Sequence, residues 1–119
     1  MAVTIYHNPR CSKSRQTLEL IVDSGVAHTI VAYLDQTPDG ATILDLAHKL
    51  KIPVAGLLRR GEGAFKEAVD LPDLGNDAQL ADWLAENPIV LERPIIIHND
   101  SGDAVIGRPP ENVQRLLSQ

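Results

Sequence analysis

The fold is decided by residues 3–15, which read VTIYHNPRCSKSR. The first four of these residues have the composition of a short strand, and Pro9 lies just beyond its end. Over residues 12–24 the apolar side chains recur at helical spacing, and Gly25 suits the end of a helix. Cys11 thus stands where the predicted helix begins, and a helix N-terminus favours a thiolate and binds anions. The segment predicts a reactive thiol, because the thiolate is the nucleophilic form of cysteine.

Further strands extend this start to an α/β fold. A strand over 29–33 completes a strand–helix–strand unit, in which the two strands are normally parallel. Near the end of the chain a buried strand over 94–98, a turn and a strand over 104–107 predict a β-hairpin. A last helix begins at residues 109–110. The predicted sheet is therefore mixed.

The region between these two halves is predicted to be helical. One helix begins at Thr37-Pro38, and another is capped by Asp77. The order of elements resembles a thioredoxin or glutaredoxin fold with a helical insertion between the βαβ half and the ββα half. We expect a single domain over 1–119, with the insertion at roughly 38–88.

Composition excludes several classes of function. The chain has 119 residues and a net charge of −5, with 11 basic and 16 acidic residues and only 3% aromatic residues. We expect no nucleic-acid ligand, because nucleic acid binds to clustered Lys and Arg and stacks on aromatic rings, and this chain is acidic and poor in aromatic residues. No run of residues approaches the length of a membrane span, and the N-terminus leads straight into a strand pattern instead of a signal peptide. A cytoplasmic protein without membrane contact is expected.

The single cysteine limits the chemistry that the thiol can complete alone. Cys11 is followed three positions later by Ser14, a hydroxyl where a dithiol redox site has a resolving cysteine. If Cys11 is oxidised or derivatised, the resolving thiol must come from another molecule, such as glutathione or a glutaredoxin-type partner. The alternative is a buried structural cysteine.

The chain offers a set of cationic neighbours for this thiol. His7 precedes Cys11 by four residues and is a candidate to help hold the thiolate, or else a capping or solvent-facing histidine. Arginine suits oxyanions because its planar fork donates paired hydrogen bonds and keeps its charge. The two ends of the predicted hairpin bring Arg93 and Arg108 close together. Arg59 follows an apolar pair in the insertion, and Arg60 competes with it for any role at the site. Converging on a thiolate, three arginines would bind a tetrahedral oxyanion, whereas each alone is more typical of a surface ion pair.

Other familiar site motifs are missing from the sequence. It has no glycine-rich phosphate loop with its lysine, no second cysteine near the first, and no paired-histidine zinc motif. The four histidines show no metal-ligand spacing, and one cysteine makes a structural zinc site unexpected. No bound metal or cofactor is expected.

Four segments resemble the glutaredoxin-linked arsenate reductases, in order along the chain. They are residues 5–15 (IYHNPRCSKSR), 57–59 (LLR), 87–95 (NPIVLERPI) and 107–109 (GRP). The resemblance implies that Cys11 is the nucleophile that attacks arsenate and that His7 and Ser14 tune its thiolate. It also implies that the oxyanion is held by Arg59, Arg93 and Arg108.

The family resemblance further implies the reaction cycle. Arsenate forms an adduct with the thiol, glutathione attacks this adduct as co-substrate, and glutaredoxin resolves the mixed disulfide as arsenite is released. This is a route of arsenic detoxification. Two alternatives remain open: a thiol-dependent reductase of another oxidised substrate, and an Spx-like regulator that shares the fold and binds RNA polymerase. The redox-sensing members of that second group use Cys-x-x-Cys, which this chain lacks.

Overall fold

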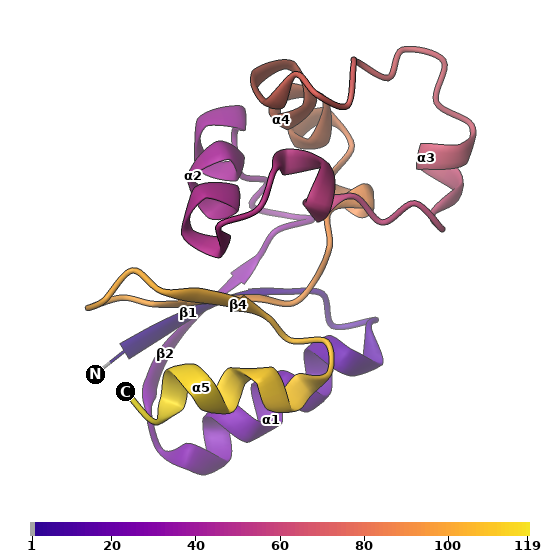
Figure 1. Cartoon of the computed structure of the whole chain (residues 1–119). Helices are drawn as coiled ribbons and strands as arrows, with labels where there is room; N and C mark the ends of the chain where they lie inside the picture. The colour runs from indigo at the N-terminus through magenta and orange to yellow at the C-terminus, as the bar shows by residue number, and fades with distance from the viewer. Residues whose placement is uncertain (1) are drawn as a thin grey trace. The chain divides into compact units, whose positions relative to one another are not determined.

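A computed structural model describes residues 2–119 of the chain (Figure 1). The described chain divides into two compact units. Residues 2–36 and 93–119 form the first unit, and Thr37–Glu92 form the second. The helical insertion expected at 38–88 falls within the second unit, and the expectation of a single domain stays a prediction.

The first unit is built on a four-stranded mixed sheet with the strand order β2-β1-β3-β4. Strand β1 (Ala2–His7) pairs in parallel with β2 (Ala27–Ala32) and antiparallel with β3 (Ile95–His98). Strand β3 in turn pairs antiparallel with β4 (Ala104–Ile106). A parallel βαβ half joined to a β-hairpin half is the thioredoxin-like arrangement, so the predicted fold class is confirmed.

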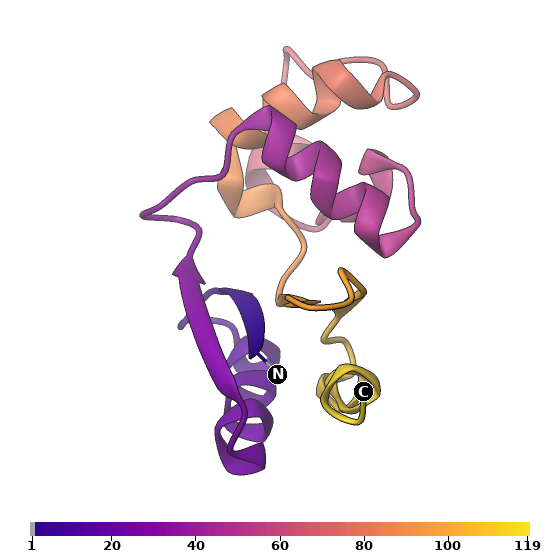
Figure 2. The same cartoon turned by 90° about the vertical axis from the view of Figure 1, so that its left-hand side faces the viewer.

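Helices cover one face of this sheet. Helix α1 (Ser12–Ser24) and the C-terminal turns η3 (Pro110–Val113) and α5 (Gln114–Leu117) lie on the same side of the strands in both views (Figures 1 and 2). Gly25 ends α1 in the left-handed conformation, with φ of 75°, as its place in the sequence predicted.

The core of the first unit lies between the sheet and these helices. Alternate residues of β1 are buried, because successive side chains of a strand point to opposite faces. Val3 and Ile5 pack in one apolar cluster with Ile21 of α1 and Leu116 of α5. His7 follows in the same alternation and is also buried, so the strand places this imidazole on the face that carries α1.

The second unit is helical. Its elements are α2 (Gly40–Leu50), η1 (Val54–Leu57), α3 (Gly63–Lys66), α4 (Asp77–Glu86) and η2 (Pro88–Val90). The two longer helices, α2 and α4, pack against each other. Their buried residues include Ile43 and Leu46 of α2 and Leu80 and Leu84 of α4, at the spacing of one helical face.

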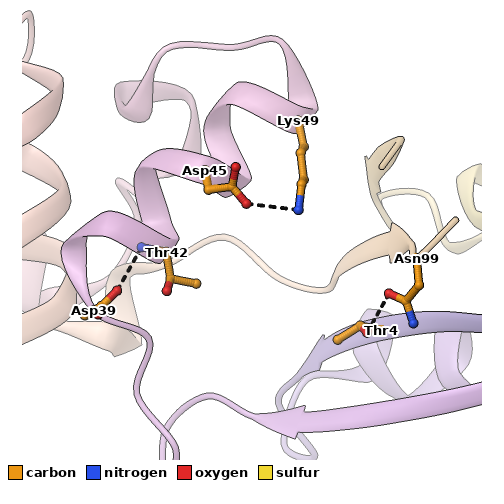
Figure 3. Close-up of polar contacts among 6 residues, drawn as sticks. All are labelled: Thr4, Asp39, Thr42, Asp45, Lys49 and Asn99. Atoms are coloured by element: carbon orange, nitrogen blue, oxygen red, sulfur yellow. Dashed lines mark hydrogen bonds and ion pairs between the residues drawn. The ribbon is translucent and has the colours of Figure 1, made fainter. Parts of the chain in front are cut away.

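Both predicted helix starts in this unit are wrong by one or more residues. Asp39, and not Thr37, caps α2, because its carboxylate accepts a hydrogen bond of 2.8 Å from the Thr42 N–H (Figure 3). Asn76 caps α4 by accepting from the Gln79 N–H at 3.1 Å, which leaves Asp77 as the first helical residue. In both segments two neighbouring residues were able to cap, and only the fold decides which one reaches the free N–H.

Candidate active site around Cys11

Cys11 occupies the N-cap position of α1. Its backbone is extended, with φ of −93° and ψ of 122°, and its carbonyl accepts the first helical hydrogen bond from Arg15 N–H at 3.0 Å. A tight turn leads into this position, because the Cys11 N–H donates to the Asn8 carbonyl at 3.0 Å. The thiol itself is partly exposed. The turn after β1 therefore holds the sulfur at the start of the helix and within reach of solvent.

The surroundings lower the pKa of the Cys11 thiol. Partial burial is the largest influence and raises the pKa, but the backbone N–H of Ser14, the Arg108 guanidinium, the N–H of Lys13 and the Arg93 charge together outweigh it. The sulfur makes no cap hydrogen bond of ordinary geometry, so these N–H groups act on it as oriented dipoles at the helix terminus. The direction of the shift is that expected of a nucleophilic cysteine.

The Arg108 side chain contacts the sulfur. Its Nη2 donates to Cys11 Sγ at 3.1 Å, and its Nε donates to the Arg93 carbonyl at 2.8 Å. The register of the hairpin explains this placement. Ile95 lies opposite Ile106, Arg93 stands two residues before Ile95, and Arg108 stands two residues after Ile106. Arg93 is 6% exposed and precedes a cis peptide bond to Pro94. The structure thus brings Cys11, Arg93 and Arg108 together.

His7 and Ser14 form a buried pair beside the thiol. His7 Nδ1 lies 2.6 Å from Ser14 Oγ, and the same oxygen accepts from the Asn8 N–H at 3.0 Å. Burial lowers the pKa of His7, and the nearby positive charge of Arg15 lowers it further. The neutral imidazole is therefore favoured. His7 holds the Ser14 side chain in place, while Ser14 influences the sulfur through its backbone N–H.

Arg59 lies in the second unit, between η1 and α3. Its N–H donates to the Val90 carbonyl at 2.7 Å, beside the isolated bridge between Leu58 and Leu91. Its Nε lies 3.7 Å from Glu62 Oε1. The structure describes Arg59 within its own unit, so its expected contact with the oxyanion stays a prediction.

Sequence reasoning missed three residues around the thiol. Asn8 is buried and accepts from the Arg10 N–H through Oδ1 at 3.0 Å, a local turn that Asn commonly makes. Thr17 is fully buried on α1, and its Oγ1 donates to the Lys13 carbonyl at 2.8 Å. Gly107 packs against Thr17, a contact between residues distant in sequence that no local pattern signals.

Residues 2–119 offer neither a metal-ligand cluster nor a membrane-spanning helix. No group of three or more His, Cys, Asp or Glu side chains gathers there in a way that suits a metal ion. Within the same residues, no helix has the length and apolar character needed to cross a bilayer. At the thiol site, a cysteine with a lowered pKa is flanked by a guanidinium and helix N–H groups, which suits an attack on an anionic or oxidised group.

The chain matches the model of one protein family from residue 6 to residue 116, and that family is ArsC. The chain belongs to the ArsC family. This ArsC-family chain is 44% identical over 117 residues to an arsenate reductase of Neisseria meningitidis serogroup A, covering 97% of each chain. It is also 44% identical to the uncharacterized protein YfgD of Escherichia coli K12, covering 97% of this chain and 96% of the other. A solved arsenate reductase of Vibrio cholerae has a TM-score of 0.85, 37% identity and 98% coverage of both chains.

Proposed function

We propose that this chain is an arsenate reductase in which the Cys11 thiolate attacks arsenate. The observation that carries the proposal is the 3.1 Å contact between Arg108 Nη2 and Cys11 Sγ at the start of α1. A fixed guanidinium at this point offsets the repulsion between a thiolate and an approaching oxyanion. Membership of the ArsC family, with relatives named arsenate reductases, supports arsenate as the substrate.

The first chemical step joins sulfur to arsenic. Cys11 Sγ donates an electron pair to arsenic(V), and one arsenate oxygen leaves as water after taking up protons. Arg108 and Arg93 stabilise the remaining oxygens, whose charge changes as the new bond forms. Arg59 supplies a third guanidinium to the oxyanion in this proposal, as the family resemblance implies.

The second step reduces arsenic and uses an outside thiol. Glutathione attacks the adduct, the glutathione and Cys11 sulfurs join in a disulfide, and arsenic keeps the electron pair and leaves as arsenite. Each sulfur loses one electron, and arsenic gains two. Glutaredoxin then reduces the mixed disulfide and returns the Cys11 thiolate. This cycle fits a chain with a single cysteine and Ser14 three residues later. We place the reaction in the cytoplasm, where such thiol systems stay reduced.

The proposal is tested with a coupled assay. Purified protein, glutathione, glutaredoxin and glutathione reductase are expected to consume NADPH in proportion to added arsenate. Cys11→Ser is expected to abolish this consumption, because a serine hydroxyl is not ionised at neutral pH. The fold should persist, since serine is a favourable N-cap residue and is expected to keep or raise stability by up to about 1 kcal/mol. Arsenate-independent NADPH consumption, or none with the wild-type protein, would overturn the assignment.

A second candidate is a reductase of another oxidised substrate that uses the same thiol. Its supporting observation is the partly exposed Cys11 with a lowered pKa, which suits many electrophiles. The two functions differ in their need for the arginines. Turnover of a neutral disulfide substrate that survives loss of Arg108, without any arsenate turnover by the wild type, favours the second candidate.

A further inference from the structure

Gly107 is a crowded glycine beside the thiol site. A Cβ atom built on it would lie 2.6 Å from Thr17 Oγ1, 2.7 Å from Pro94 Cγ and 3.1 Å from Thr17 Cγ2. Real Cβ atoms essentially never come closer than 3.0 Å to such neighbours. The φ angle of Gly107 lies outside the left-handed region, so its backbone is open to other residues. Glycine is required at this position for space and not for conformational freedom.

The atoms around Gly107 have little freedom to give way. Thr17 is fully buried on α1, is β-branched, and is tied to the Lys13 carbonyl by its hydroxyl. Pro94 is a buried ring directly before β3, and the Gly107 N–H donates to its carbonyl at 2.9 Å. Neither neighbour is the far end of a flexible side chain. An added methyl group would therefore displace the backbone of residue 107.

Such a displacement passes directly to Arg108. The Arg108 N–H donates to the Ile106 carbonyl at 2.9 Å, which closes a tight turn around Gly107. From this turn the guanidinium reaches both the Arg93 carbonyl at 2.8 Å and Cys11 Sγ at 3.1 Å. Hydrogen bonds weaken steeply as distance and angle depart from their best values. A shift of a few tenths of an ångström at the turn thus weakens the contact with the sulfur.

We propose that Gly107 is a positioning residue, whose close packing on Thr17 and Pro94 sets the distance between the Arg108 guanidinium and the Cys11 sulfur. The same contact fixes the start of α1 against the end of the hairpin, since Thr17 lies on that helix. The part of this inference that concerns catalysis rests on the proposed function. The part that concerns the thiol does not, because the geometry around the sulfur exists without substrate.

The test is the rate of alkylation of Cys11 by iodoacetamide, measured against pH in Gly107→Ala. The midpoint of this titration is expected to rise, and alkylation at neutral pH to slow by about three- to tenfold, because Arg108 supports the thiolate less well. Arsenate turnover should fall at least as much. A role of Gly107 in stability alone would lower the melting temperature and leave the midpoint where it is, and that result would overturn the proposal.

Gly63→Ala is the matched control. A Cβ at Gly63 meets nothing within 4 Å, and its φ also lies outside the left-handed region. This variant is expected to keep both the wild-type midpoint and the wild-type turnover. Because the midpoint is measured without arsenate, a protein that lacks arsenate turnover can still support or contradict the role of Gly107.

A second pair of variants covers the case in which Gly107→Ala does not fold. Thr17→Ala and the double variant Thr17→Ala/Gly107→Ala both lack the Thr17 atoms that crowd the glycine. They differ only in the methyl group at residue 107, which still meets Pro94. A higher alkylation midpoint in the double variant supports the proposal, and equal midpoints overturn it.

Discussion

Two helix N-termini of this chain use their free N–H groups and partial positive charge in different ways. Helix α2 begins behind Asp39, whose carboxylate accepts from the Thr42 N–H at 2.8 Å and closes the cap. Helix α1 begins behind Cys11, whose side chain closes no cap hydrogen bond. One terminus uses its free N–H groups for stability, and the other leaves them available to a thiolate and an anion.

The pKa shifts of the two cap residues follow the same contrast. Hydrogen bonds from Thr42 lower the pKa of the exposed Asp39 carboxyl. At Cys11, burial raises the pKa of the thiol, but the helix N–H groups and the two arginines lower it by more, so the net shift is downward. Because folding lowers both values, each group stabilises the fold at pH above its ordinary pKa, and this contribution is lost as pH falls through the lowered folded value. The open cap of α1 forgoes about 0.5–2 kcal/mol of stability that a good capping side chain supplies.

Removing the guanidinium at the N-terminus of α1 should change the thiol pKa and the turnover more than any of the substitutions below. Arg108→Ala is expected to raise the pKa of the Cys11 thiol and to lower kcat/KM for arsenate by about 10²–10³-fold, the usual cost of losing one donor to a developing anion. Alkylation against pH measures the first effect, and the coupled assay measures the second.

Arg115→Ala is the control for charge. Arg115 lies in the same unit and donates to the Ala104 carbonyl at 3.0 Å, so its loss removes one positive charge and one backbone contact. Its thiol titration and turnover should match the wild type. Equal losses in both variants would mean that overall charge, and not the 3.1 Å contact, governs the thiol.

The parts of the fold that the sequence predicted are those with local signals. The spacing of apolar residues predicted strand β1 and helix α1, and the glycine at position 25 predicted where the helix ends. The structure gives this glycine a φ of 75°. The hairpin over β3 and β4 follows from two apolar runs around a turn. The caps of α2 and α4 were misplaced, because Thr37 competes with Asp39 and Asp77 with Asn76. Such neighbours have similar propensities, and the choice depends on the local backbone path.

The candidate site was predictable where it depends on the hairpin. Arg93 and Arg108 flank the paired ends of β3 and β4, so their closeness follows from the register. The contact of Thr17 with Gly107 joins residues that are 90 positions apart, and no sequence pattern around either residue predicts it. The sequence also did not predict the separate roles of the two polar groups of Ser14. Its backbone N–H acts on the sulfur, whereas its hydroxyl contacts His7.

Removing the Ser14 hydroxyl should separate these two contributions. Ser14→Ala leaves the buried Asn8 N–H and His7 Nδ1 without their partner, so it is expected to lower the free energy of unfolding by about 1–3 kcal/mol. The thiol titration should change little, because the backbone N–H remains. Denaturant unfolding and alkylation measure the two effects. Ser24→Ala, at the other end of α1, is the control for loss of a helix serine that donates to a carbonyl. A rise in the thiol midpoint as large as that in Arg108→Ala would show that the hydroxyl acts on the sulfur.

Opening the closed terminus should have the smallest effect and no effect on the thiol. Asp39→Ala removes the acceptor for the Thr42 N–H, so the melting temperature is expected to fall modestly at neutral pH. The difference from wild type should shrink below about pH 4, because the depressed pKa of Asp39 means that its contribution is lost only as the carboxylate protonates. Asp45→Ala is the matched control, since it removes the same charge from α2 but only an exposed pair with Lys49. If both variants lower the melting temperature equally at every pH, the α2 terminus is stabilised by charge alone. The two helix termini would then differ in the charge of the side chain at the N-cap and not in whether that side chain makes a cap hydrogen bond.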